Sequence, residues 1–173
     1  MEAINKLREQ FPETAKDMKL NLSNVLGENS LNVDQKWGTA VACAIATRNE
    51  ELSAAVLLDA KSAGISEGAL DDARAAATIM GMNNIYYRFL HFIEKDDYSQ
   101  KRATLRMNYI ARPKGEKADF ELICLAVSAM NGCQACVNSH EKAVLDGGLS
   151  TDHVHDAVRI ASVLQGSAIS LEY

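Results

Sequence analysis

The stretch NGCQACVNSHE, residues 131–141, organises the chain, because it holds two of the four cysteines as a Cys-x-x-Cys pair. An apolar, helix-like run from Leu122 to Met130 leads into it, and Asn131-Gly132 interrupts that run. Asn and Gly are common at helix ends and caps. We therefore predict that one helix ends at this interruption and that a new helix starts at or near Cys133.

A Cys-x-x-Cys pair at a helix start lies among unpaired backbone N–H groups and at the positive end of the helix dipole. Such surroundings can lower a thiol pKa from about 8.5 to roughly 3.5–7.5. Helical spacing places along one stripe, which we expect to face the core, Cys133, Cys136 or Val137, His140 and Val144. His140 should then lie close to Cys136, where an imidazole can take or return the thiol proton.

The bulk composition sets limits on function and location. The net charge of −5 and the lack of a Lys/Arg cluster argue against nucleic-acid binding. No apolar run approaches the roughly 18 residues of a membrane helix, and the N-terminus lacks the basic-then-apolar pattern of a signal peptide. Cys43 and Cys124 lie singly in apolar helical runs and are expected to be buried. We therefore predict a cytoplasmic protein, in which a disulfide is catalytic rather than structural.

The apolar pattern is helical throughout, and no stretch alternates long enough to predict a strand. We expect an all-α fold. The polar segment 96–117 is predicted to be a loop or a short helix with a connection, and to mark the boundary between two halves. The predicted helices span residues 2–10, 13–26, 33–47, 50–63, a long segment capped by Ser66 and reaching Ile93 with a break near Gly81, 120–130, 133–145 and 150–165.

The two halves resemble each other in sequence. Residues 63–66, AGIS, match residues 147–150, GGLS, at an offset of 84. We interpret the chain as a single domain over residues 1–173, with a degenerate N-terminal half at about 33–95 and a redox-active C-terminal half at about 118–170. At the same offset the two cysteines and the histidine correspond to Asn49, Leu52 and Val56, so the first half should be scaffold.

The pattern Glu121…Cys133-x-x-Cys136-x-x-x-His140 resembles the alkyl hydroperoxidase D family, within the carboxymuconolactone decarboxylase superfamily. The glutamate twelve residues before the first cysteine, the chain length and the two-part organisation all contribute to the resemblance. One departure is Ala135, because many members carry a second histidine just before the second cysteine. The resemblance implies an AhpD-like helical fold of two related halves with one active centre per chain.

We expect two-cysteine redox chemistry, in which thiolate attack on a hydroperoxide gives a sulfenic acid that the neighbouring cysteine resolves as a Cys133–Cys136 disulfide. General physics leaves the attacking cysteine open, since the helix dipole favours Cys133 and proximity to His140 favours Cys136. The resemblance implies that Cys136 attacks, that Cys133 donates the proton and resolves, and that Glu121 and His140 form a proton relay. Ala135 cannot act as a second relay histidine.

Glu121 has a second interpretation. If Asp119 caps its helix, Glu121 would be a first-turn acid that interacts with the dipole at the surface. Against this, Glu121, Cys124 and Ser128 share one face of a helix that is otherwise nearly all apolar. The resemblance favours a functional role for Glu121.

Two alternatives to the redox enzyme stay open. A non-redox carboxymuconolactone decarboxylase-type enzyme would have no need of paired thiols. A zinc-stabilised helical binding protein could use the two cysteines and His140 with a fourth ligand from His153 or His155. That spacing matches no known zinc finger.

The resemblance also implies partners. Such proteins commonly pass electrons to the disulfide of a peroxiredoxin-type alkyl hydroperoxide reductase, and a dihydrolipoyl group on a lipoylated acyltransferase reduces their own disulfide. No bound organic cofactor is expected, because the chain has no Gly-rich phosphate loop. With 47% apolar residues in short helices, we expect alanine-rich faces that favour a homo-oligomer, and the resemblance implies a trimer.

Overall fold

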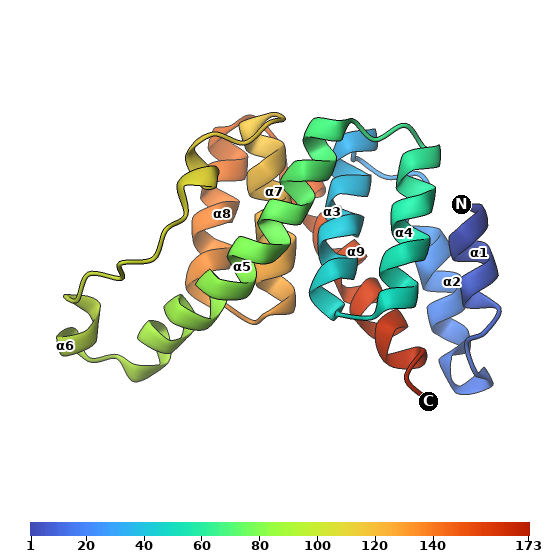
Figure 1. The fold of residues 1–173 in the computed structure, drawn as a ribbon, viewed down its shortest axis with the longest axis horizontal. Coiled ribbons are helices and arrows are strands. Elements are labelled where there is room, and N and C mark those ends of the chain that lie inside the picture. Colours follow the sequence, from blue (N-terminus) through green and yellow to red (C-terminus); the bar gives the residue numbers. More distant parts are fainter.

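The computed structural model describes residues 1–173, and it contains helices and turns without a strand, which confirms the all-α prediction. None of the helices is both long and apolar enough to cross a membrane. The elements, drawn in Figure 1, are α1 (Glu2–Arg8), the 3₁₀ turn η1 (Glu13–Ala15), α2 (Lys16–Val25), α3 (Val33–Thr47), α4 (Glu50–Ser62), α5 (Glu67–Ile93), α6 (Asp96–Ser99), the 3₁₀ turn η2 (Asn108–Ala111), α7 (Lys117–Met130), α8 (Gln134–Asp146) and α9 (Thr151–Ser170).

Two helices, α3 and α7, form the centre of the molecule. They pack on each other, and both pack on α5 and α9, while α4 lies against α3 and α8 lies against α7 (Figure 1). Every residue from Phe120 to Ser128 of α7 is buried. A helix that is buried all round has no solvent for its polar groups, so Glu121 and Ser128 must find partners inside the protein.

The long helix α5 begins where the sequence predicts it. The Ser66 side chain caps it by accepting a hydrogen bond from the backbone N–H of Ala69. The predicted break near Gly81 is wrong, because α5 runs unbroken to Ile93. A glycine inside a helix costs only about 1 kcal/mol relative to alanine, and α5 packs against α3, α7 and α8.

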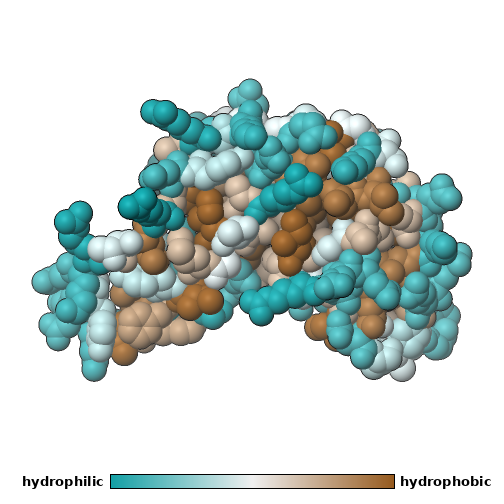
Figure 2. All heavy atoms as spheres, in the orientation of Figure 1, coloured by the Kyte–Doolittle hydropathy of each residue, from teal (hydrophilic) through white to brown (hydrophobic).

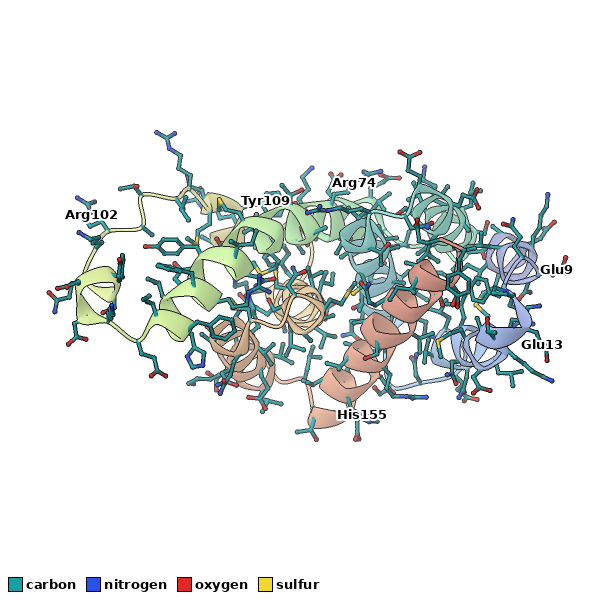
Figure 3. The ribbon with its side chains drawn as sticks, turned by 90° about the horizontal axis from the view of Figure 1, so that it is seen from below. Glu9, Glu13, Arg74, Arg102, Tyr109 and His155 are labelled. Carbon is teal, nitrogen blue, oxygen red and sulfur yellow. A yellow bond between two sulfur atoms is a disulfide. The ribbon has the colours of Figure 1, made fainter.

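The segment between α5 and α7 leaves the helical body, passes α6 and Arg102, and returns beside α5 at Tyr109 (Figures 1 and 3). Its return is fixed by the buried carboxylate of Asp72 on α5, which accepts a 2.8 Å hydrogen bond from the Tyr109 hydroxyl. The backbone N–H groups of Lys114 and Gly115 donate to the same carboxylate, also at 2.8 Å. One buried acid therefore anchors the connection between the two halves.

The helix boundaries repeat at the offset of the sequence match. Helices α3, α4 and α5 start 84 residues before α7, α8 and α9 respectively. The loop anchors repeat as well. Asp156 on α9 accepts bonds from the backbone and hydroxyl of Ser30, just as Asp72 accepts one from the backbone of Lys114. At the offset of 84, Asp72 corresponds to Asp156 and Ser30 corresponds to Lys114. These correspondences support our proposal that the halves are related.

Candidate active site

The two cysteines of the motif lie at the turn from α7 to α8. Gly132 has a φ of 65°, a left-handed conformation that glycine adopts without a steric penalty, and this reverses the chain after α7. The backbone N–H of Cys133 then bonds to the carbonyl of Ser128 at 3.1 Å. Cys133 is the N-cap of α8, and Cys136 lies in its first turn, so the helix starts where the sequence predicts it.

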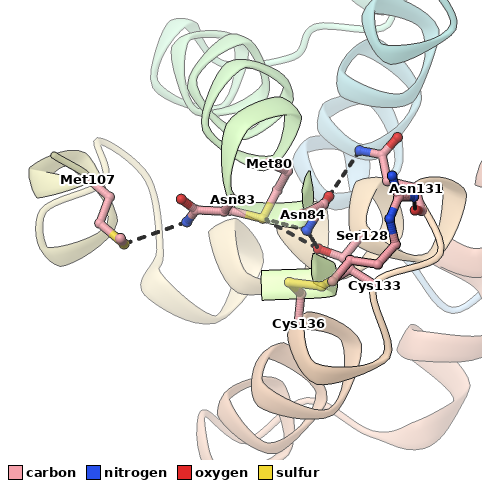
Figure 4. The surroundings of a disulfide bond; sticks show 9 residues. Met80, Asn83, Asn84, Met107, Ser128, Asn131, Cys133 and Cys136 are labelled. Carbon is pink, nitrogen blue, oxygen red and sulfur yellow. Dashed lines mark hydrogen bonds between the residues drawn. A yellow bond between two sulfur atoms is a disulfide. The ribbon is translucent and has the colours of Figure 1, made fainter. Parts of the chain in front are cut away.

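Cys133 and Cys136 form a disulfide, drawn in Figure 4, with their Cα atoms 5.3 Å apart. Cys133 is 0% exposed and Cys136 is 7% exposed. By contrast, Cys43 and Cys124 are free thiols buried in the core. Burial raises the pKa of each of these two thiols far above its ordinary value, which keeps them protonated and unreactive.

Glu121 and His140 meet across the α7–α8 interface. His140 Nδ1 lies 2.6 Å from Glu121 Oε2, and Lys117 Nζ lies 2.5 Å from Glu121 Oε1, one turn earlier on α7. Burial by itself raises the pKa of Glu121, but the hydrogen bonds from His140 and Lys117 outweigh it and hold the pKa below its usual range. Glu121 is therefore an ionised, buried carboxylate whose two oxygens both have partners.

The surface interpretation of Glu121 is wrong, because the residue is only 6% exposed. Asp119 does not cap the helix either. Helix α7 starts at Lys117, its N-cap Glu116 makes no side-chain bond, and the carboxylate of Asp119 accepts a 2.7 Å bond from Gln35 Nε2 on α3. The helix begins three residues earlier than the apolar pattern predicts, which moves Asp119 inside the first turn.

A pocket of about 310 Å³ joins these groups, at the lower end of the size range of ligand sites. It contains Cys136, His140 and Glu121 but not Cys133, so Cys136 is the cysteine that borders it. Most of the remaining lining is apolar. The full lining is contributed by α5, the α6–α7 segment, α7 and α8: Asn83, Tyr87, Met107, Ile110, Glu121, Ala135, Cys136, Ser139, His140 and Ala143.

A larger depression of about 490 Å³ lies between α3 and α5. Its charged groups are Arg48 and Arg88, and no thiol, carboxylate or imidazole contributes to its lining. The smaller pocket brings together a motif cysteine, a carboxylate and an imidazole, so it is the candidate active site.

Residues of α5 that the sequence analysis did not assign to the site hold the turn that carries Cys133. Asn84 bonds through its amide to the Ser128 hydroxyl and to the Asn131 side chain, both at 2.9 Å (Figure 4). Arg88 donates to the Asn131 carbonyl, and His91 Nε2 lies 3.1 Å from Gln134 Oε1. In the sequence, the pair Asn83-Asn84 interrupts an otherwise apolar run, and this pattern could have predicted buried polar contacts.

Lys117 was also missed. Its position four residues before Glu121 is the usual spacing of a helical ion pair and could have indicated the contact. Besides Glu121, its Nζ bonds to the carbonyl of Ile110 in η2 at 2.5 Å. Lys117 thus links the Glu121 carboxylate to the α6–α7 segment, which contributes Ile110 to the pocket wall.

The zinc hypothesis needs His153 or His155 near the cysteines. His153 instead lies at the start of α9, where its Nδ1 is 2.8 Å from the Ser150 hydroxyl as part of a capping box. No group of three or more His, Cys, Asp or Glu side chains lies together in a position to hold a metal ion.

Comparisons with known proteins bear on the motif and on the whole chain. The model of the Carboxymuconolactone decarboxylase family matches residues 96–171. A protein named alkyl hydroperoxide reductase AhpD from Anaeromyxobacter dehalogenans (strain 2CP-1) is 54% identical over 172 residues, 99% of this chain and 92% of the relative. Proteins of the same name from Gluconacetobacter diazotrophicus and Rhodopseudomonas palustris (strain BisA53) are 51% and 50% identical over 170 residues, 98% of this chain and 93% of each relative.

Proposed function

The chain belongs to the alkyl hydroperoxide reductase AhpD family, and from this membership we propose that it is an antioxidant enzyme that reduces organic hydroperoxides with Cys133 and Cys136. The observation that carries the proposal is the pairing of Cys136 with Cys133 at the edge of a pocket that also holds the Glu121–His140 pair. An oxidoreductase uses such paired thiols. A decarboxylase has no task for them.

In the proposed cycle, the Cys136 thiolate attacks the terminal oxygen of the hydroperoxide. The S–O bond forms, the O–O bond breaks, and the leaving alkoxide takes a proton to become an alcohol. The Cys133 thiolate then attacks the sulfenic sulfur of Cys136, and hydroxide leaves as water when it is protonated. Two thiols and one hydroperoxide thus give one disulfide, one alcohol and one water.

The roles follow from position. Cys136 is the attacking residue because it borders the pocket, and Cys133 resolves because it lies outside the lining. Glu121 accepts a hydrogen bond from His140 Nδ1, which leaves Nε2 as the nitrogen that exchanges protons with the reacting groups. Lys117 keeps Glu121 ionised. Ala135 contributes only a methyl group, so proton transfer depends on His140.

The disulfide must be reduced again after each turnover, and we assign this step to a dihydrolipoyl group on a lipoylated acyltransferase. A peroxiredoxin-type alkyl hydroperoxide reductase is the proposed acceptor of electrons from the reduced pair, by thiol–disulfide exchange. Both assignments rest on family membership. Family membership also leads us to propose that this protein forms a homo-oligomer, specifically a trimer, and that it acts in the cytoplasm.

The test of the cycle is the loss of either thiol. Cys133→Ser and Cys136→Ser should each abolish turnover of tert-butyl hydroperoxide with dihydrolipoamide, because neither single thiol can close the disulfide. Cys43→Ala and Cys124→Ala are the matched controls and should retain the chemistry, with some loss of stability, since both thiols are buried and protonated. Near-wild-type steady-state turnover by Cys133→Ser or Cys136→Ser would exclude the two-cysteine cycle.

A further inference from the structure

Asn83, on α5, is a buried amide in the pocket of Cys136 that uses little of its hydrogen-bonding capacity. The residue is 5% exposed, and its Oδ1 has no hydrogen-bond partner. Its Nδ2 donates only to the sulfur of Met107, at 3.5 Å (Figure 4). A thioether is a weak acceptor. Leaving a buried polar group unsatisfied lowers the stability of the fold, so the protein retains Asn83 against its own stability.

The neighbouring residue provides a contrast. Asn84 is equally buried, yet its Nδ2 donates to the Ser128 hydroxyl and its Oδ1 accepts from Asn131, so its role is fully structural. Two other buried side-chain atoms lack partners, the hydroxyls of Thr39 and Ser167, and neither residue lines the pocket of Cys136. Asn83 is the one unsatisfied group that borders the reacting sulfur's pocket. Unsatisfied groups that persist in native structures call for a functional explanation.

We propose that Asn83 is a catalytic residue whose amide binds the peroxide group of an organic hydroperoxide and presents its terminal oxygen to Cys136. The proposal rests on the proposed function and adds to it the group that recognises the substrate. A hydroperoxide carries one O–H donor and two acceptor oxygens, and an amide carries the complementary acceptor and donors. Rotation about χ2, which is soft for Asn, turns the unused amide atoms to the pocket.

The amide also serves the bond-breaking step. When the O–O bond breaks, negative charge develops on the oxygen that leaves with the alkyl group. A hydrogen bond from an N–H to an anionic oxygen is roughly twice as strong as one to a neutral oxygen. The Nδ2–H groups of Asn83 exchange the Met107 sulfur for this oxygen, and so stabilise the transition state more than the ground state.

The rest of the lining indicates the substrate class. Tyr87, Met107, Ile110 and Ala143 line the same pocket as the amide, with apolar surface that can contact an alkyl or aryl group. Hydrogen peroxide has no such group. The pocket therefore favours organic hydroperoxides, with the peroxide end at Asn83 and the hydrocarbon end against these four side chains.

The test compares two reactions of the same thiol in the reduced full-length protein. Asn83→Leu replaces the amide with an apolar group of similar size. The rate of oxidation by cumene hydroperoxide should fall by at least about tenfold, since removing one oxyanion-hole donor typically costs 10²–10³ in rate. The rate of alkylation by iodoacetamide at the same pH should not change, because the thiolate itself is untouched. The midpoint of thermal unfolding should stay the same or rise.

Two control variants separate substrate binding from packing. Ser167→Ala removes another unsatisfied buried group outside the pocket and should change neither rate. Asn84→Leu removes satisfied bonds and should lower the unfolding midpoint. Asn83→Ala, which suits a helix, gives the same ratio of peroxide to alkylation rates should the leucine variant fail to fold.

An unchanged peroxide rate in either Asn83 variant would overturn the proposal. So would a parallel fall of the peroxide and alkylation rates with a lower unfolding midpoint, since that pattern belongs to a structural residue. Failure of the proposed function is distinguishable, because the wild-type protein itself would then not be oxidised by cumene hydroperoxide, and Asn83 would lose its role with it.

Discussion

At the scale of single residues, the sequence could locate the cysteine pair and His140 but could not decide the state of Glu121. The spacing of Cys133, Cys136 and His140 is local, and helical periodicity alone brings them to one side of α8. The partner of Glu121 is on a different helix, 19 residues away. Burial and a long-range contact decide whether a first-turn acid is a surface group or a buried carboxylate, and neither is contained in the local pattern.

The relay is tested by the pH dependence of thiol alkylation. His140→Phe should raise the pKa of the reactive thiol and slow its alkylation near neutral pH, because the imidazole no longer takes the proton. The slowing should shrink above the thiol's own pKa, where ionisation needs no help. Glu121→Gln should shift the profile in the same direction but more weakly. A His140→Phe profile that overlays the wild type would exclude the relay, and an unchanged Glu121→Gln profile would exclude only the glutamate.

Lys117 offers a second test at this scale. Hydrogen bonds from His140 and Lys117 depress the pKa of Glu121, so the stability that its charge contributes is present above the unfolded pKa of about 4.3 and is lost as pH falls through the lower folded pKa. Lys117→Met removes one of these bonds, which raises the folded pKa. Acid unfolding, followed by circular dichroism, should then begin at a higher pH than in the wild type.

The matched control is Lys142→Met. Lys142 also forms an i,i+4 pair, with Asp146, but both side chains are largely exposed. Such pairs contribute little to stability, so the acid transition should stay where it is in the wild type. A transition at the wild-type pH in Lys117→Met as well would mean that Lys117 has no influence on Glu121.

At the scale of elements, the sequence predicted most helices and their order but not the contacts between the halves. Turn and capping residues such as Ser66 act locally, so helix starts can be read from the sequence. The break expected at Gly81 is absent because tertiary packing overrides a weak local preference. The anchoring of the α6–α7 segment by Asp72 joins residues about forty positions apart, and no local pattern encodes it.

The anchor predicts a coupled loss of stability and activity. Asp72→Ala leaves the Tyr109 hydroxyl and the N–H groups of Lys114 and Gly115 without their acceptor, and should lower the free energy of unfolding by about 3 kcal/mol in urea titrations. The peroxide rate should fall as well, since this segment carries Met107 and Ile110 of the pocket wall. Asp71→Asn, an exposed neighbour, should cost under about 1 kcal/mol.

The same contact has a signature at alkaline pH. Burial and the bond to Asp72 raise the pKa of Tyr109 to about 12. Because the folded pKa is raised, the stability from this neutral tyrosine is present below the unfolded value of about 10 and is lost as pH rises through the folded value. Ultraviolet titration of Asp72→Ala should show one more tyrosine ionising near pH 10 than in the wild type. An identical titration would mean that Asp72 does not hold Tyr109.

At the scale of the whole molecule, one end of the surface is unusually apolar. Large hydrophobic side chains at the C-terminal end of α5 and in α6 are exposed: Ile85 by 62%, Phe89 by 44%, Phe92 by 73% and Tyr98 by 38%. Figure 2 shows hydrophobic atoms among hydrophilic ones at this end of the molecule. Clustered exposed apolar groups mark interaction surfaces. From composition we predicted alanine-rich faces that favour a homo-oligomer, whereas the exposed cluster at this end consists of large side chains of α5 and α6.

This surface predicts the state of assembly. Light scattering of the wild-type protein at micromolar concentration should give about three times the 18.8 kDa chain mass. Phe92→Glu places a charge at the most exposed residue of the apolar cluster, where burial against another copy would desolvate it, and should give the mass of a single chain. Leu20→Glu changes an equally exposed leucine on α2 and should leave the assembly intact. A single-chain mass for the wild type would exclude the oligomer, and a trimeric Phe92→Glu variant would place the interface elsewhere.

Assembly should also affect activity. Tyr87 of the pocket and Asn84, which holds the Cys133 turn, lie on the same helix as Phe92, so contacts between copies should help to hold the pocket and this turn in place. Phe92→Glu should therefore lower the peroxide rate more than Leu20→Glu does.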